Sequence, residues 1–147
     1  MDWEKYEEQK QEKGKQERME EIIQIAKKII TEEVEKAGYN IIKIILFGSR
    51  VKGNYHEESD WDFFVVLNED ITFGELKRIT GRIKMQLARH KIPNDIILRG
   101  INQFKKSKMT VGNISYYVST DGVSIWIMKK WKNGYRIIDK RISSEFI

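Results

Sequence analysis

Two short stretches of the sequence decide the fold: LFGSRVKG at residues 46–53 and SDWDFFVV at residues 59–66. The first ends an apolar run, Ile41–Phe47, which is rich in β-branched residues, is bounded by glycines and is typical of a buried strand. The second begins a similar run, Asp60–Leu67. A polar segment with two glycines, residues 48–59, separates the runs, so we expect two strands joined by a loop.

Two carboxylates stand at the beginning of the second strand. Asp60 and Asp62 are two residues apart, and because side chains alternate along a strand, both point to one face of the sheet. Such neighbours repel each other unless a cation, a shared proton or solvent compensates their charge. Mg²⁺ suits the pair because it binds one or two carboxylates together with water and substrate phosphates. The structural alternative is a strand edge with two solvated acids.

The loop between the strands carries groups that suit a phosphate. Gly48 allows the backbone to approach a ligand closely, and the Ser49 hydroxyl and nearby N–H groups could then bind phosphate oxygens. Arg50 and Lys52 carry positive charge that could neutralise a triphosphate. Each of these two cations could equally be an ordinary surface charge, so both interpretations stay open at this point.

A third carboxylate, Asp95, lies near the start of another predicted strand, Asn94–Leu98, which follows Pro93. An Asp among apolar residues is unfavourable unless it has a charged or hydrogen-bonded partner. A position of this strand beside Asp60–Leu67 would bring Asp95 to the other two carboxylates. The alternative is that Asp95 caps a turn after the proline.

The rest of the chain predicts a mixed sheet with helices packed on it. Apolar spacing predicts helices at Trp3–Lys36, whose charged first half is either a solvated helix or a frayed arm, and at Thr72–His90. Beyond residue 100 we expect a helix at Lys108–Ser119, strands at Val123–Trp131 and Tyr135–Ile142, and a turn at Asn133–Gly134. The fold class is α/β (α+β): a small mixed β-sheet flanked by helices, with a long N-terminal helix and a C-terminal hairpin.

Composition limits the classes of protein. A length of 147 residues predicts one domain, in which we distinguish an N-terminal helix at 1–37, a core at 38–128 and a basic C-terminal extension at 129–147. The chain has no Cys, and we therefore expect no disulfide and no thiolate metal site. No run is apolar enough to span a membrane, so we expect a cytoplasmic protein without a membrane partner. The net charge of +5 favours polyanionic ligands.

The motif as a whole resembles that of a known superfamily. Gly48-Ser49, ten intervening residues, Asp60-x-Asp62 and a later strand Asp are similar to the signature of the DNA polymerase beta-type nucleotidyltransferases. The runs VGNISYY at residues 111–117 and DGVSIW at residues 121–126 are similar to the minimal nucleotidyltransferase branch of that superfamily. The resemblance covers roughly residues 41–126. It implies the nucleotidyltransferase fold and transfer of a nucleotidyl group from a nucleoside triphosphate.

The resemblance also implies a role for each motif residue. Gly48 and Ser49 would hold the triphosphate of ATP. Asp60 and Asp62 would bind two Mg²⁺ ions, and Asp95 would complete one metal site and help to deprotonate the acceptor hydroxyl. Further candidates for nucleotide binding are Arg50, Lys52 and Ser59. The chain departs from the family pattern in having Lys52 where a second Arg is common, and Trp61, where a small aliphatic residue is usual, is expected to point away from the carboxylates.

The minimal branch suggests an acceptor. Its members commonly act as antitoxins that attach AMP from ATP to a Tyr of a HEPN-type ribonuclease toxin. The resemblance thus implies a protein adenylyltransferase with a toxin as its protein partner. Two alternatives stay open: transfer to a small hydroxylated molecule or an RNA 3′ end, and an inactive module that binds nucleotide or a toxin. Nucleic acid is a less favoured partner than protein.

Overall fold

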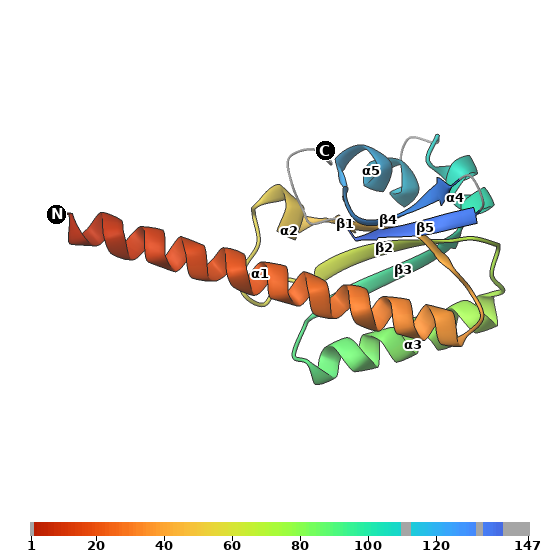
Figure 1. Ribbon diagram of the computed structural model, residues 1–147, viewed down its shortest axis with the longest axis horizontal. Coiled ribbons are helices and arrows are strands. Elements are labelled where there is room, and N and C mark those ends of the chain that lie inside the picture. The colour runs from red at the N-terminus through yellow and green to blue at the C-terminus, as the bar shows by residue number, and fades with distance from the viewer. Residues whose placement is uncertain (1, 110–112, 132–133, 140–147) are drawn as a thin grey trace.

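The computed structural model describes residues 2–109, 113–131 and 134–139, with side chains for residues 2–109 and 113–126. Its helices and strands follow one another along the chain as Figure 1 shows. They are α1 (Trp3–Lys36), β1 (Ile41–Phe47), α2 (Ser49–Lys52), β2 (Trp61–Leu67), α3 (Phe73–Arg89), β3 (Asn94–Gly100), α4 (Ile101–Ser107), α5 (Ile114–Asp121), β4 (Val123–Trp131) and β5 (Gly134–Asp139).

The strands within the described residues form one mixed sheet in the order β3-β2-β1-β4-β5. β1 lies antiparallel to both of its neighbours, β2 and β4, and β4 lies antiparallel to β5. β2 and β3 are parallel, which requires a crossover between them, and α3 provides it. The predicted α+β fold, with a mixed sheet flanked by helices, is therefore confirmed.

Apolar side chains fill both faces of the sheet. On one face, α1 and α3 supply buried residues such as Ile30 and Ile83, which join a core that also contains Phe63. On the other face, Phe64 packs with Phe104 of α4 in a smaller core to which α5 also contributes. Because Phe63 and Phe64 are consecutive, successive residues of β2 point to opposite faces. The helices of the two layers lie on either side of the sheet in Figure 1.

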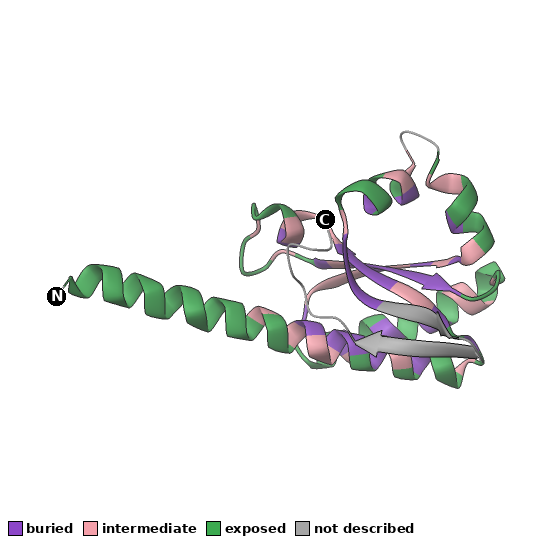
Figure 2. Ribbon diagram, turned by 45° about the horizontal axis from the view of Figure 1, so that its top comes forward, coloured by how far each residue is buried: buried purple, intermediate pink, exposed green. Residues whose placement is uncertain are grey.

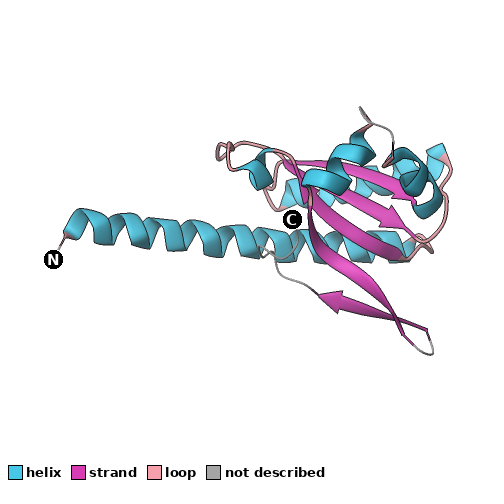
Figure 3. Cartoon of the chain, turned by 90° about the horizontal axis from the view of Figure 1, so that it is seen from above, coloured by secondary structure: helices cyan, strands magenta, loops and turns pink. Residues whose placement is uncertain are grey.

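The helix α1 extends well past the sheet that its second half covers (Figures 2 and 3). Asp2 caps its N-terminus, because the carboxylate accepts a hydrogen bond of 3.2 Å from the N–H of Lys5. Residues 2–18 are all exposed, whereas the buried residues of the helix begin at Ile23. Of the two expectations for the charged first half, the structure therefore shows the solvated helix. No helix in the described part of the chain is long and apolar enough to cross a membrane.

The expected helices and strands as far as β3 agree with the structure to within about two residues, while the short helix α2 lies in what was expected to be a loop. The region after β3 agrees less well. The single helix expected at Lys108–Ser119 is wrong, because α4 ends before it and α5 begins within it. α4 forms directly after β3, where its Phe104 is buried against Phe64.

The predicted C-terminal hairpin is confirmed by the pairing of β4 with β5. Residue Asn133 of the expected turn and the expected end of the last strand, residues 140–142, lie outside the described residues. The division of the chain at residues 37 and 128 stays a prediction.

Candidate active site

The three predicted carboxylates are arranged by the pairing of two parallel strands. Asp62 of β2 lies directly opposite Asp95 of β3 in the register of the sheet. Asp60 lies immediately before β2 and is exposed to solvent. The expected position of the third predicted strand beside the second is thus confirmed. All three residues lie where these two strands begin.

Asp62 belongs to the face of the sheet that α4 and α5 cover. In β2, Trp61, Phe63 and Val65 belong to the core under α1 and α3, while Phe64 belongs to the core on the opposite face. Because side chains alternate, Asp62 shares the face of Phe64. Asp95 shares this face for the same reason, since its neighbour Ile96 belongs to the other core. Trp61 is 1% exposed and points away from the carboxylates, as predicted.

Gly48 brings the backbone next to Asp62. β1 ends at Phe47, which pairs with Asp62, so Gly48 follows directly where the strand meets α2. Its φ is +79°, in the left-handed region that favours glycine. A Cβ at this position would collide with the Asp62 carboxylate. Gly48, from the first half of the sequence motif, therefore lies in close contact with Asp62, from the second half.

The carboxylates interact electrostatically. Asp62 is half-buried, and its pKa is raised from 3.8 to about 6, first by burial and then by the negative charges of Asp95 and Asp60. Lys84 of α3 forms an ion pair with Asp95, with 3.6 Å between Nζ and Oδ1. Both side chains of this pair are about half exposed, so the pair is screened by solvent. The result is a cluster of three carboxylates in which Lys84 forms an ion pair with Asp95.

This cluster has the chemistry of a partial magnesium site. Among the described residues, no three Asp, Glu or His side chains converge closely enough to hold a metal ion by themselves. Mg²⁺ does not require such a cage, since it is commonly bound by one or two carboxylates, water and substrate phosphates. Burial, and then the charges of Asp95 and Asp60, raise the pKa of Asp62, so a cation beside this carboxylate would favour its ionised form. The donor set therefore fits Mg²⁺ bound together with a nucleotide.

Arg50 lies in a buried position and organises the loop before Asp60. Its Nη2 donates hydrogen bonds to the carbonyl oxygens of Glu57, at 3.1 Å, and Ser59, at 2.9 Å. Its guanidinium lies 4.6 Å from the ring centroids of both Tyr55 and Trp61. Burial lowers the pKa of the guanidinium from its ordinary value. These contacts position the backbone next to Asp60, while direct binding of a triphosphate by Arg50 stays a prediction.

The other nucleotide-binding candidates lie in the same loop. Ser49 is half-buried and is the first residue of α2, next to Gly48. Lys52 is exposed at the end of that short helix. The Ser59 hydroxyl accepts a hydrogen bond of 2.7 Å from the N–H of His56, which closes the turn before Asp60. The loop thus brings all the predicted residues to the beginning of β2, and their contacts with a nucleotide stay predictions.

Two further residues of this region were not among the sequence predictions. Lys84 reaches Asp95 only because α3 packs across β3, and helix packing leaves no local signal in the sequence. Tyr55 is an aromatic residue within a polar loop, and that contrast could have indicated a packing role. Its ring covers the Arg50 guanidinium, and its hydroxyl donates to the Met19 sulfur at 3.3 Å.

Comparison with known proteins gives a family match over most of the chain. The family described as "Polymerase beta, Nucleotidyltransferase" matches residues 20–114, which include the loop and the strands of the site. A crystal structure of a toxin-antitoxin with AMP-PNP is similar at a TM-score of 0.47 and 18% identity, over 68% of this chain and 72% of that chain. A crystal structure of a mutant of the toxin-antitoxin MntA-HpeT has a TM-score of 0.45 and 16% identity, over 69% and 73%. No curated protein matches the chain.

Proposed function

Because the chain belongs to the polymerase beta nucleotidyltransferase family, we propose that it transfers AMP from ATP to an acceptor hydroxyl in a magnesium-dependent reaction. The observation that carries this proposal is the register of β2 and β3, which places Asp62 opposite Asp95 with Asp60 just before β2. The strand pairing brings together carboxylates that are distant in the sequence. The alternative, a strand edge with solvated acids, does not explain why a third carboxylate from another strand lies beside the first two.

The proposed roles follow from these positions. Asp60 and Asp62 would hold Mg²⁺, with Asp95 completing one site. Bound Mg²⁺ supplies charge that stabilises both the attacking and the leaving oxygen of an in-line displacement. Gly48 and Ser49 would bind phosphate oxygens of ATP at the end of β1. Arg50 fixes the backbone of the loop that leads to Asp60 and so keeps the first carboxylate in place.

The chemical step exchanges one phosphorus–oxygen bond for another. The acceptor oxygen forms a bond to the α-phosphorus of ATP, and the bond from that phosphorus to the pyrophosphate oxygen breaks. The acceptor hydroxyl loses its proton, and Asp95 is the proposed recipient. In this arrangement the protein contributes mainly position and charge, which is common in reactions of phosphate esters.

For the acceptor, we propose a tyrosine hydroxyl of a HEPN-type ribonuclease toxin. The support is the resemblance of residues 111–117 and 121–126 to the minimal nucleotidyltransferase branch. The exposed first half of α1 adds a surface that a protein partner could contact. A toxin encoded beside this chain is the first acceptor to test.

The test follows the label from [α-³²P]ATP with Mg²⁺ into three kinds of acceptor: the neighbouring toxin, RNA, and small hydroxylated molecules such as aminoglycosides. We expect label on the toxin. Mass spectrometry should show AMP joined to a tyrosine oxygen through a phosphodiester bond. The double variant Asp60→Asn, Asp62→Asn should give no label. Label on RNA or on a small molecule alone would contradict the protein acceptor and leave nucleotidyl transfer intact. Equal labelling by the double variant would contradict the mechanism itself.

A further inference from the structure

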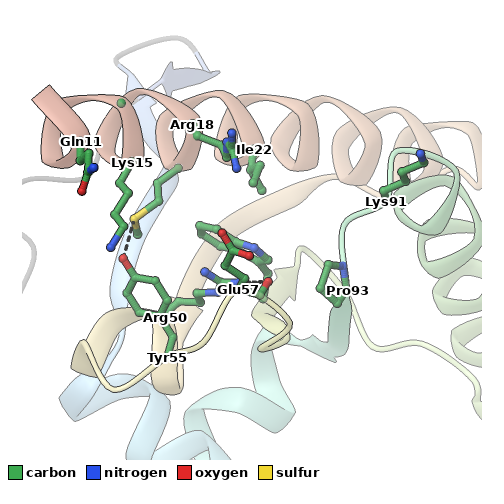
Figure 4. Close-up of a pocket in the computed structure, with 12 residues that line it drawn as sticks. Gln11, Lys15, Arg18, Ile22, Arg50, Tyr55, Glu57, Lys91 and Pro93 are labelled. Atoms are coloured by element: carbon green, nitrogen blue, oxygen red, sulfur yellow. Dashed lines mark hydrogen bonds between the residues drawn. The ribbon is translucent and has the colours of Figure 1, made fainter.

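A cleft of about 650 Å³ lies between the first half of α1 and the loop that joins α2 to β2 (Figure 4). One wall is a single stripe of α1, because its residues recur at spacings of three and four. These residues are Gln11, Gly14, Lys15, Arg18, Met19 and Ile22. Arg50, Tyr55 and Glu57 lie across the cleft from this stripe.

The charges around the cleft are mostly positive. Lys15 and Arg18 of α1 and Lys91 of the α3–β3 turn are exposed cations on its walls, and Arg50 is a fourth cation. Glu57 is the one acid among the lining residues that the structure describes. Cations that line one cleft from separate elements give it a positive potential, which attracts anions.

The cleft also has a buried polar group and an apolar floor. Arg50 is 9% exposed, and its Nε has no hydrogen-bond partner among the described residues, although its Nη2 has two. A buried polar atom without a partner is uncommon in folded proteins. Trp61, Met19 and Pro93 give the cleft apolar surface. This combination suits a ligand that has both an anionic group and an organic part.

The cleft is distinct from the proposed catalytic site. Trp61, which lines it, belongs to the core under α1 and α3, while the next residue, Asp62, lies on the opposite face of the sheet. Arg50 is the link between the two, because it lines the cleft and binds the carbonyl oxygen of Ser59, next to Asp60. A ligand in the cleft would therefore contact a residue that positions the catalytic loop.

We propose that this cleft is a second anion-binding site, which takes a phosphorylated small molecule. Its volume lies within the range of about 300–1,000 Å³ that is usual for small-molecule sites. Lys15 and Arg18 would bind the phosphate groups by charge-assisted hydrogen bonds, while Lys91, at the far end of the cleft from Lys15, adds positive charge. The apolar floor would contact the organic part. The inference does not rest on the proposed function, because the site uses none of the three carboxylates.

The experiment is calorimetric titration of the full chain with ADP and with inorganic pyrophosphate, in EDTA and about 0.15 M salt. EDTA removes Mg²⁺ and with it the metal-dependent binding of phosphates near Asp62. The test variant is Lys15→Glu, Arg18→Glu. The matched control is Lys10→Glu, Lys13→Glu, which makes the same charge change on the same helix outside the cleft. All four positions are exposed, so both variants are expected to fold, and circular dichroism checks this.

We expect the wild-type chain to bind at least one of the two probes, and the cleft variant to weaken that binding by roughly tenfold or more through the loss of two charge-assisted contacts. The control should change it by less than about threefold, since its charges act only at a distance. Tighter binding of ADP than of pyrophosphate would support a role for the apolar floor. The proposal is overturned when neither probe binds, or when the cleft variant and the control lose affinity equally.

Discussion

Gly48 is required both by the backbone conformation at the end of β1 and by the nearby Asp62 carboxylate. It has a positive φ, and a side chain there would collide with the Asp62 carboxylate. Gly53, five residues later, also has a positive φ, but a Cβ there meets nothing within 4 Å. The backbones also differ, because Gly48 has a ψ of −155°, in a region that essentially only glycine adopts, whereas Gly53 has a ψ of 2° and is left-handed α.

This difference makes a prediction about two alanine variants. Gly53→Ala should lower the free energy of unfolding by about 1–2 kcal/mol through left-handed strain alone. Gly48→Ala should lower it by about 1–3 kcal/mol more, because its backbone conformation is more strained for alanine and the added methyl group displaces Asp62. Chemical denaturation measures both. Equal losses for the two variants would contradict the special constraint on Gly48.

The pKa of Asp62 makes a prediction about pH. This pKa is raised from 3.8 to about 6 in the folded chain, so ionisation of Asp62 opposes folding. Its contribution to stability is present below about pH 4 and is lost as the pH rises through 6. In EDTA, Asp62→Asn should therefore be more stable than the wild type at pH 7.5, with the difference shrinking towards pH 4. Thermal unfolding across this range is the measurement, and a difference independent of pH would contradict the assignment.

The carboxylates could be predicted from sequence at the residue scale, but their surroundings could not. Spacing alone predicts that Asp60 and Asp62 share one face of a strand, although β2 begins at Trp61 and Asp60 lies just before it. The contact of Lys84 with Asp95 depends on how α3 lies across the sheet, which no local pattern encodes. Arg50 likewise looked like a loop cation, and its burial between two aromatic rings follows from the course of the loop.

At the scale of elements, the short helix α2 carries two cations in different environments. Arg50 is buried and holds two backbone carbonyl oxygens, while Lys52 is exposed. Arg50→Lys should therefore lower the free energy of unfolding by roughly 1.5–3 kcal/mol, because a lysine cannot reproduce the charge-assisted bonds and the stacking. Lys52→Ala should change it by less than about 0.5 kcal/mol.

The two variants should also differ in kinetics. Lys52→Ala is expected to raise the KM for ATP with little change in stability, as loss of a triphosphate contact would. Steady-state transfer rates alongside denaturation curves provide the comparison. A stable Arg50→Lys protein with wild-type rates would contradict the positioning role of Arg50.

The sheet shows which elements could be predicted. β1, β2 and β3 were recognisable because each contains a short run of β-branched or aromatic residues with polar or glycine residues at its ends. Their register could not be predicted, because strand pairing depends on residues far apart in the sequence. Only the neighbourhood of β2 and β3 was expected, since it would bring Asp95 to the other two carboxylates. The α4–α5 region was wrongly predicted because α4 follows β3 without a loop, and Gly100, which ends β3 and precedes α4, has no capping side chain to indicate a helix.

At the scale of the whole molecule, α1 divides into a half that covers the sheet and a half that projects beyond it (Figure 2). The projecting half has no buried residue from 2 to 18, so tertiary packing adds little to its stability. Amide protons of residues 5–18 should exchange with solvent faster, by roughly 100-fold or more, than those of the buried stretch 26–34. Hydrogen exchange by NMR measures this. Equal protection from exchange along the whole of α1 would contradict the prediction that its first half lacks tertiary packing, and would indicate that a partner covers that half.

The central claim is that the carboxylates at the beginning of β2 and β3 carry out nucleotidyl transfer. The most direct measurement is the initial rate of AMP incorporation from [α-³²P]ATP by Asp62→Asn, compared with Asp70→Asn, in which the same change is made at an exposed residue beyond the opposite end of β2. The account predicts a loss of roughly 10²-fold or more for Asp62→Asn and a rate within about twofold of the wild type for Asp70→Asn. Equal rates for the two variants would contradict it.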